Sequence, residues 1–178
     1  MFFNFKGTTV LWLFLFVVAS CSDFSQKEQL TKVEALQKEV TNLEGDFLKS
    51  FPDTLSALRL TMMSTETAVK NKIILDSVDR SFSADMDAYK LTRKKIGPIN
   101  EEYVKLKKAF SQEKSALMNL YNDINNGWGK RDEYDNYLQQ EARNVKELKK
   151  GSLELKRQLQ ILNQEFSLLH PKISALIK

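Results

Sequence analysis

The stretch that decides the fold covers residues 138–176 and reads LQQEARNVKELKKGSLELKRQLQILNQEFSLLHPKISAL. Steps of three and four alternate along it, through positions 138, 141, 145, 148, 152, 155, 159, 162, 166, 169, 173 and 176. Ten of these twelve positions are apolar, and the exceptions are Glu141 and Ser152. A heptad repeat of this length predicts one long helix that packs against other helices with coiled-coil geometry.

Three further stretches carry apolar residues at helical spacing. They run through Val33, Leu36, Val40, Leu43, Phe47, Phe51, Leu55, Leu58 and Met62; through Leu75, Val78, Phe82, Met86 and Tyr89; and through Tyr103, Leu106, Phe110, Leu117, Leu120 and Ile124. Together the four stretches predict an all-α fold, an elongated antiparallel bundle of about four long helices with coiled-coil-like packing. This helical bundle domain is expected to occupy residues 28–178.

Proline, glycine and polar clusters set the expected ends of the helices. The first stripe crosses Pro52, which indicates either one helix over residues 25–63 that is kinked there or a break followed by a new helix. We expect the second helix to begin near residues 64–67 and to end before Gly97. The third is expected to end at Gly127, where the chain turns.

The N-terminus has the layout of a secretory signal. Lys6 is the only charged residue among the first twenty, and residues 10–18 form an unbroken apolar run (VLWLFLFVV) before Ala19 and Ser20. Nine apolar residues rise only about 14 Å as a helix, against a hydrocarbon core of about 30 Å. We therefore predict a signal peptide over residues 1–20 rather than a transmembrane anchor.

Val18-Ala19-Ser20-Cys21 closes this segment and resembles the bacterial lipobox, in which an aliphatic residue and two small ones precede a cysteine that is acylated. Cys21 is the only cysteine in the chain, so no disulfide can form within it. The resemblance implies that Cys21 carries palmitate or a similar lipid and attaches the mature protein to a membrane. The stretch from Ser22 to about Lys27 is polar and short, so residues 21–27 would form a short tether from the lipidated cysteine. An ordinary signal peptide followed by a chance cysteine is the alternative.

Two resemblances point to the Bacteroidota. Ser22-Asp23-Phe24 resembles the acidic tag that sends lipoproteins of these bacteria to the outer face of the outer membrane. Residues 103–177, with Asn125-Asn126-Gly127 and Leu168-Leu169-His170-Pro171, resemble in layout the small uncharacterised helical lipoproteins of the same group, a family without an assigned activity. The resemblances imply a lipid-anchored protein of the cell envelope at the outer membrane, and they leave open whether it faces the periplasm or the surface.

Reactive side chains are sparse. The net charge of +4 is too small to argue for nucleic acid as a partner. His170 is the only histidine, so the usual zinc sites cannot be built from this chain alone, and no phosphate-binding loop or dinucleotide fingerprint occurs. Pairs of acids such as Asp85 and Asp87 are ordinary on solvated helix faces. We predict no catalytic residues, no cofactor, no metal site and no enzymatic activity.

These observations favour a membrane-tethered helical lipoprotein that binds or spaces another component of the bacterial cell envelope, so we expect a protein partner there. The alternative is a surface-exposed lipoprotein that binds an external ligand, as an adhesin or an inhibitor does.

Trp128 stands between two glycines in the turn that precedes the last helix. Counting four helix directions from Cys21 predicts that this turn lies at the far end of the bundle, about 45–60 Å from the bilayer. Its indole is either a contact for a partner or a plug at the end of the core.

Two triplets, Asp53-Thr54-Leu55 and Asp76-Ser77-Val78, resemble the short O-glycosylation site of exported Bacteroidota proteins. The resemblance implies that Thr54 and Ser77 carry a sugar and face solvent, because burying a polar sugar is costly. A pattern of three residues also arises easily by chance.

Overall fold

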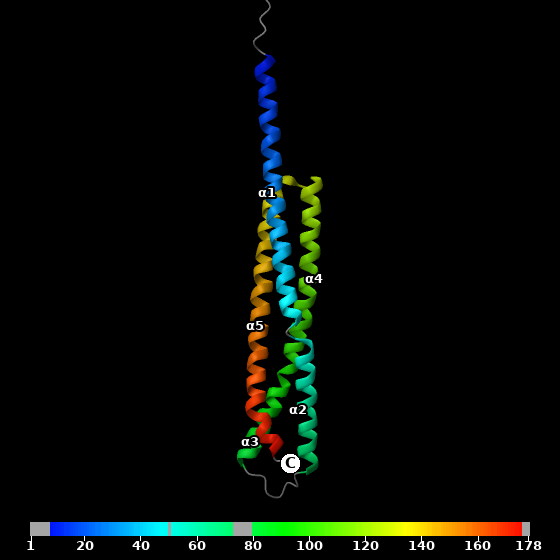
Figure 1. Ribbon diagram of the computed structural model, residues 1–178, viewed down its shortest axis with the longest axis vertical. Helices are drawn as coiled ribbons and strands as arrows, with labels where there is room; N and C mark the ends of the chain where they lie inside the picture. The colour runs from blue at the N-terminus through cyan, green and yellow to red at the C-terminus, as the bar shows by residue number, and fades with distance from the viewer. Residues whose placement is uncertain (1–7, 50, 73–79, 176–178) are drawn as a thin grey trace, which may run out of the picture. The chain divides into compact units, whose positions relative to one another are not determined.

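The structure is a computed structural model that describes residues 8–49, 51–72 and 80–175, and at residues 8–23, 52–54 and 81 it describes the backbone alone. In chain order the helices are α1 (Thr8–Lys49), α2 (Pro52–Lys72), α3 (Arg80–Lys94), α4 (Ile96–Asn126), the 3-10 turn η2 (Arg131–Glu133) and α5 (Tyr134–Ala175) (Figure 1). These ranges contain no strand. The predicted all-α fold with four long helices is confirmed, and the shorter α3 accompanies them.

The helices form two compact units, and α1, α4 and α5 each contribute to both. Unit 1 combines Met1–Thr41 with Gln112–Val145, and unit 2 combines Asn42–Ser111 with Lys146–Lys178. Each unit thus joins segments that are far apart in the sequence.

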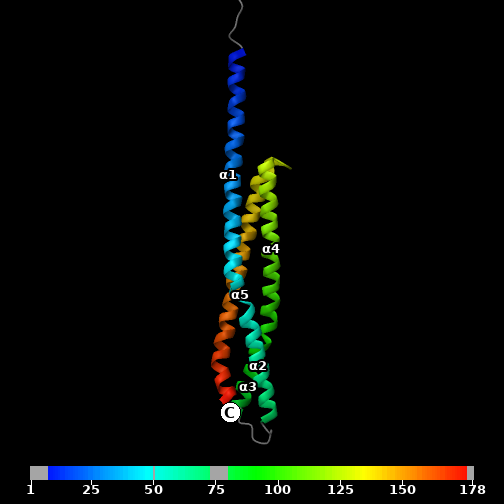
Figure 2. The same cartoon turned by 45° about the vertical axis from the view of Figure 1, so that its right-hand side comes forward.

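Unit 1 contains three helical segments. Gln26 Nε2 donates a hydrogen bond to the carbonyl oxygen of Ile124 at 2.7 Å, and Gln37 Nε2 donates one to that of Leu117 at 3.2 Å. Residue numbers rise along α1 while they fall along α4, so these two helices are antiparallel. After a short turn α5 returns beside α4 and therefore runs parallel to α1 (Figure 2). The buried core of unit 1 contains Val33, Val40, Leu117, Leu120, Ile124, Tyr134, Leu138 and Val145.

Unit 2 is held by aromatic contacts between its helices. The ring of Tyr103 stacks on those of Phe47 and Phe51, with centroids 5.1 and 5.4 Å apart. The Tyr89 hydroxyl of α3 lies 2.9 Å from Nδ1 of His170 in α5. Further buried residues of this unit are Leu55, Leu58, Met62, Val69, Met86, Ile96, Ile99, Leu106, Phe110, Leu148, Leu155, Leu159, Leu162 and Ile173.

The heptad positions of α5 face inward, as the sequence predicts. Leu155, Leu162 and Ile173 are at most 1% exposed, and the other apolar positions between 138 and 173 are buried or half-buried. The register of the longest stripe is therefore confirmed throughout the described part of this helix.

The first predicted helix is interrupted before Pro52 and does not continue through it as one kinked helix. The helix before it ends at Lys49, and α2 begins at Pro52 itself. Proline has no backbone N–H and is favoured in the first turn, where that donor would have no helical partner. Phe51, in the connection, is 1% exposed and is fixed by packing.

The predicted start of the second helix at residues 64–67 is wrong. These residues lie inside α2, which continues to Lys72, and the next helix in the described part of the chain begins at Arg80. The hydroxyl of Thr65 donates to the carbonyl oxygen of Thr61 at 2.8 Å, and that of Thr67 donates to Met63 at 2.9 Å. The hydroxyls that indicated a helix cap instead bond back along a continuing helix.

Residues 21–27, which we expected to form a polar tether, are helical and belong to α1. A signal peptide that ends after residue 20, and a tether over residues 21–27 once it is removed, both stay predictions.

Candidate functional site

The turn between α4 and α5 has a defined cap. The backbone N–H of Trp128 donates to the carbonyl oxygen of Asp123 at 2.8 Å, and that of Gly127 donates to Ile124 at 3.2 Å. This pair of bonds is the Schellman arrangement, which requires a left-handed residue just after the helix. Gly127 has a φ of 65° and fills that position. The sequence prediction that Asn126 and Gly127 end this helix is confirmed.

Two further contacts fasten the turn. The hydroxyl of Tyr134, a residue only 4% exposed, lies 2.9 Å from the carbonyl oxygen of Asp123 and 2.5 Å from that of Trp128. Arg131 Nε donates to the carbonyl oxygen of Gly127 at 3.2 Å. The backbone of the turn is therefore held by the hydroxyl of a buried tyrosine and by a guanidinium group.

This anchored backbone leaves the indole of Trp128 outside the core. Its side chain is 62% exposed, so it does not plug the end of unit 1. Gly129 follows with a φ of 78°, a second left-handed residue. Of the two alternatives raised by the sequence, the plug is excluded, and a contact with a partner stays a prediction.

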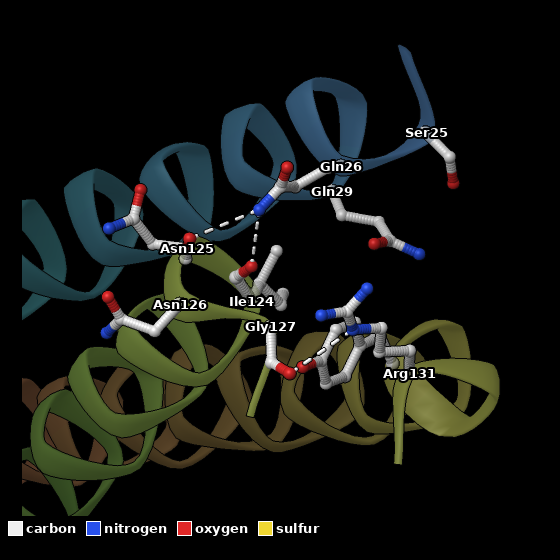
Figure 3. Close-up of a pocket in the computed structure, with 9 residues that line it drawn as sticks. Ser25, Gln26, Gln29, Ile124, Asn125, Asn126, Gly127 and Arg131 are labelled. Atoms are coloured by element: carbon white, nitrogen blue, oxygen red, sulfur yellow. Dashed lines mark hydrogen bonds between the residues drawn. The ribbon is translucent and has the colours of Figure 1, made fainter. Parts of the chain in front are cut away.

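A pocket of about 290 Å³ lies beneath the turn within unit 1. Its walls are mostly polar, and Figure 3 shows Gln26 reaching from α1 to the end of α4. Gln26 Nε2 donates to the carbonyl oxygens of both Ile124 and Asn125, at 2.7 and 3.2 Å. These carbonyls lie in the last turn of α4, where the N–H groups of a following helical turn are lacking. The amide gives Asn125 a donor and adds a second donor to Ile124, which also accepts the N–H of Gly127.

The same hydrogen bonds correct the expected position of the turn. Gln26 follows Cys21 by five residues on one helix, a rise of about 7.5 Å. The turn that carries Trp128 is therefore next to the segment that contains Cys21 and not at the far end. The prediction failed because it took Gly97-Pro98 as a reversal of the chain. Within unit 2, Phe51 stacks on Tyr103 of α4, and Glu66 of α2 pairs with Arg93 of α3, so residue numbers fall along α3 and α4 as they rise from Phe51 through α2. The chain therefore keeps its direction from α3 into α4.

A second site, not identified from the sequence, is a pair of acids between α4 and α5 in unit 1. Glu113 is only 7% exposed, and its Oε1 has no hydrogen-bond partner. Burial, the charge of Glu141 and a hydrogen bond to Glu141 raise the pKa of Glu113 to about 7, although a hydrogen bond from Asn144 opposes them. Asn144 Nδ2 also donates to Glu141 Oε2 at 2.7 Å.

The sequence carried a signal for this pair. Glu141 interrupts the heptad stripe of α5, and the stripe of α4, which passes through Phe110 and Leu117, places Glu113 at its own inward position. Two polar exceptions on facing stripes are expected to meet in the core. Chemically, the pair holds a carboxyl group that keeps its proton close to neutral pH.

Four further residues were singled out in the sequence: Cys21, Thr54, Ser77 and His170. The side chains of Cys21 and Thr54 and the whole of Ser77 lie outside what the structure describes. The imidazole of His170 stacks on Phe166 with centroids 4.6 Å apart and contacts Tyr89, so it belongs to the packing of unit 2.

Some of the charged residues form ion pairs between helices. Asp85 pairs with Lys172 at 3.3 Å, and Lys95 pairs with Glu165 at 2.5 Å, both inside unit 2. Within the described ranges no cluster of three or more histidine, cysteine or acidic residues has the geometry of a metal site. In the same ranges, no helix combines the length and apolar character that crossing a membrane requires. Comparisons with protein-family models, with curated proteins and with solved structures found no match to this chain.

Proposed function

We propose that the protein is a lipid-anchored helical module of the bacterial cell envelope that acts without catalysis, by binding or spacing another envelope component. The observation that carries this proposal is the sequence Val18-Ala19-Ser20-Cys21 directly after an apolar run of nine residues. The only cysteine of the chain stands where such a motif needs it, and a short basic segment precedes the run.

The character of the described residues supports a binding or spacing role over a catalytic one. The two units are built from helices with well-filled apolar stripes, and the only histidine packs between aromatic rings. Among the described residues, Glu113 is the one whose pKa is raised to about 7, and it lies inside the packed helices of unit 1. Helical surfaces of this kind suit contact with other proteins.

The exposed surface offers places for such contacts. Leu153, on α5 in unit 2, is 60% exposed and lies among the charged residues Lys146, Lys150, Glu154 and Arg157 of the same helix. Leu168, farther along the same helix, is 71% exposed. An apolar side chain among charged ones is a suitable centre for an interface, because burying it removes apolar area from water.

The anchor is tested by the substitution Cys21→Ala, with Ser22→Ala as the matched control. Cells are fed an alkyne fatty acid, and the protein is captured and labelled. We expect the wild type and Ser22→Ala to carry the label and to sediment with membranes, because acyl chains provide the membrane affinity. Cys21→Ala should lose the label. Equal labelling of Cys21→Ala would overturn the proposal.

The partner is sought with photo-crosslinking residues at Leu153 and Leu168, and with Leu162, which is fully buried, as the control position. We expect a crosslink to a defined envelope protein from at least one exposed position and none from Leu162. Protease treatment of intact cells then distinguishes the two faces: degradation supports the surface-exposed alternative, which binds an external ligand, and protection supports a periplasmic role.

A further inference from the structure

The exposed aromatic residues of this protein gather at one end of unit 1. In the described part of the chain three aromatic side chains are exposed: Phe24 at 73%, Trp128 at 62% and Tyr137 at 41%. All three belong to unit 1, whereas the exposed apolar residues of unit 2 are aliphatic. The exposed aromatic side chains of the described residues are thus confined to unit 1.

The hydrogen bonds of Gln26 fix where these residues lie. Phe24 precedes Gln26 by two residues on α1, and the carbonyls that Gln26 bonds are three and four residues before Trp128. Tyr137 lies one helical turn after Tyr134, whose hydroxyl contacts the carbonyl oxygen of Trp128. Three different segments therefore bring their aromatic side chains to the end of unit 1 that contains Cys21.

We infer that this aromatic end, defined as Phe24, Trp128 and Tyr137, rests on the lipid bilayer and inserts its rings into the interfacial region. The inference depends on the proposed function, because it takes the bilayer to which Cys21 is anchored as the occupant. Cys21 is three residues before Phe24, a rise of about 4.5 Å, so an acylated Cys21 brings the aromatic end to the membrane surface. Tryptophan and tyrosine are enriched at this level because their rings are apolar and carry a polar atom.

The charges of the turn show which force would hold the contact. Lys130 and Arg131 are followed by Asp132, Glu133 and Asp135, and Lys130 pairs with Glu133 at 3.0 Å. The turn therefore has no excess of positive charge for anionic headgroups. Ring insertion does not require such an excess, so the contact should form on neutral lipid and should persist at high salt, which screens exposed charges.

The turn is built to present its ring rigidly. The cap at Gly127, the buried hydroxyl of Tyr134 and the guanidinium of Arg131 fix the backbone on both sides of Trp128. A side chain on a backbone that is already fixed loses less conformational entropy when it enters the membrane interface than one on a flexible loop. The bilayer contact would add a second attachment beside the acyl chains and would orient unit 1 on the membrane.

The test uses the lipidated protein purified from membranes and reconstituted into phosphatidylcholine vesicles whose acyl chains carry bromine, a quencher of tryptophan. Trp12 is removed with the predicted signal peptide, so Trp128 gives the only signal. We expect blue-shifted emission, loss of emission in brominated vesicles and protection from acrylamide, all unchanged in high salt.

The matched control moves the probe along α4. Met118 is 55% exposed and lies eight residues before the end of the helix, about 12 Å farther from the anchored end. In the double variant Trp128→Phe with Met118→Trp, we expect emission that acrylamide quenches and bromine does not.

Three outcomes are distinguished by measuring the mass of the same sample. An acylated Cys21 with Trp128 quenched by bromine and the residue 118 probe unquenched supports the inference. An acylated Cys21 with Trp128 open to acrylamide and unaffected by bromine overturns it, leaves the proposed function standing and makes the aromatic end available to a protein partner. An unmodified Cys21 overturns the proposed function, and the bilayer is lost as the occupant of this surface.

Discussion

Gln26 of α1 and Ile124 of α4 are 98 residues apart in sequence and are joined by a hydrogen bond of 2.7 Å from Nε2 to the carbonyl oxygen. This bond places the end of α4 beside the segment of α1 that follows Cys21. It also makes the turn with Trp128 a neighbour of the proposed lipid anchor. The position of one amide thus links the architecture of unit 1 to its proposed attachment.

Replacing Gln26 should loosen this neighbourhood. We expect Gln26→Ala to lower the free energy of unfolding by about 1 kcal/mol, because the carbonyl oxygens of Ile124 and Asn125 lose the amide donor that joins them to α1, while Ile124 keeps the N–H of Gly127. Lys27→Ala, at an exposed neighbouring position, serves as the control and should change little. Thermal melting of the mature protein measures both, and equal melting temperatures would show that the bond does not hold α1 against α4.

Gly127 is expected to be the most sensitive residue of the turn. It has a φ of 65°, and a Cβ added there would collide with the guanidinium group of Arg131. Gly127→Ala should therefore cost about 1–2 kcal/mol for the left-handed backbone, together with displacement of the arginine. The double variant with Arg131→Ala removes the collision and should retain the backbone cost.

Gly97→Ala is the matched control for this substitution. Gly97 lies in the first turn of α4, and a Cβ there meets nothing within 4 Å. Denaturant unfolding should show no loss of stability for Gly97→Ala. A similar loss at both glycines would contradict the proposed cap.

Stability should fall as the pH rises through the range of Glu113. In the folded state its pKa is raised to about 7 from an ordinary value of 4.5, so the folded protein binds the proton that the unfolded chain has released. The contribution of Glu113 to stability is therefore fully present below pH 4.5, falls as the pH rises to about 7, and is absent at higher pH. Glu113→Gln removes the buried charge and should stabilise the protein by about 1–3 kcal/mol at pH 8.

The difference between Glu113→Gln and the wild type isolates this effect from other acids. Glu154 has its pKa lowered to about 2 by Arg157, so its own contribution is lost only as the pH falls below about 4.5. Denaturant unfolding at pH 5 and at pH 8 should show a larger advantage of the variant at pH 8. A constant difference at the two pH values would mean that Glu113 titrates as an ordinary acid.

Two neighbouring residues of α5, one buried and one exposed, should differ in how much their substitution lowers stability. Leu159 is 6% exposed, and Leu159→Ala should cost about 2–5 kcal/mol through lost burial and a remaining cavity. Gln160 is exposed, so Gln160→Ala should have little effect. Equal shifts in melting temperature would show that the register of the helix is wrong.

The apolar periodicity predicted the helices and their inward faces because the spacing of apolar residues along one helix can be read from the local sequence. The heptad of α5 is one example, and the turn at Gly127 was predicted from an equally local signal, the glycine itself. Residues 64–67 misled it, because a hydroxyl group that can cap a helix can equally bond to the carbonyl four residues earlier, as Thr65 does. The choice between these two roles depends on packing that a local pattern does not contain.

The position of the candidate site could not be predicted for a different reason. The direction of α4 relative to α1 depends on the number of reversals between them. The break between α3 and α4, which Gly97 suggested as a reversal, does not turn the chain back, because Glu66 pairs with Arg93 while Phe51 stacks on Tyr103. Trp128 was identified from its flanking glycines, but its neighbours come from contacts across almost a hundred residues. Glu113 needed two stripes to be aligned before its burial beside Glu141 became apparent.

The covalent attachment at Cys21 is tested by the intact mass of the protein purified from bacterial membranes. We expect a chain that begins at Cys21 and carries additional mass equal to its acyl groups. A chain that retains residues 1–20, or one that is cleaved elsewhere with Cys21 unmodified, would contradict it.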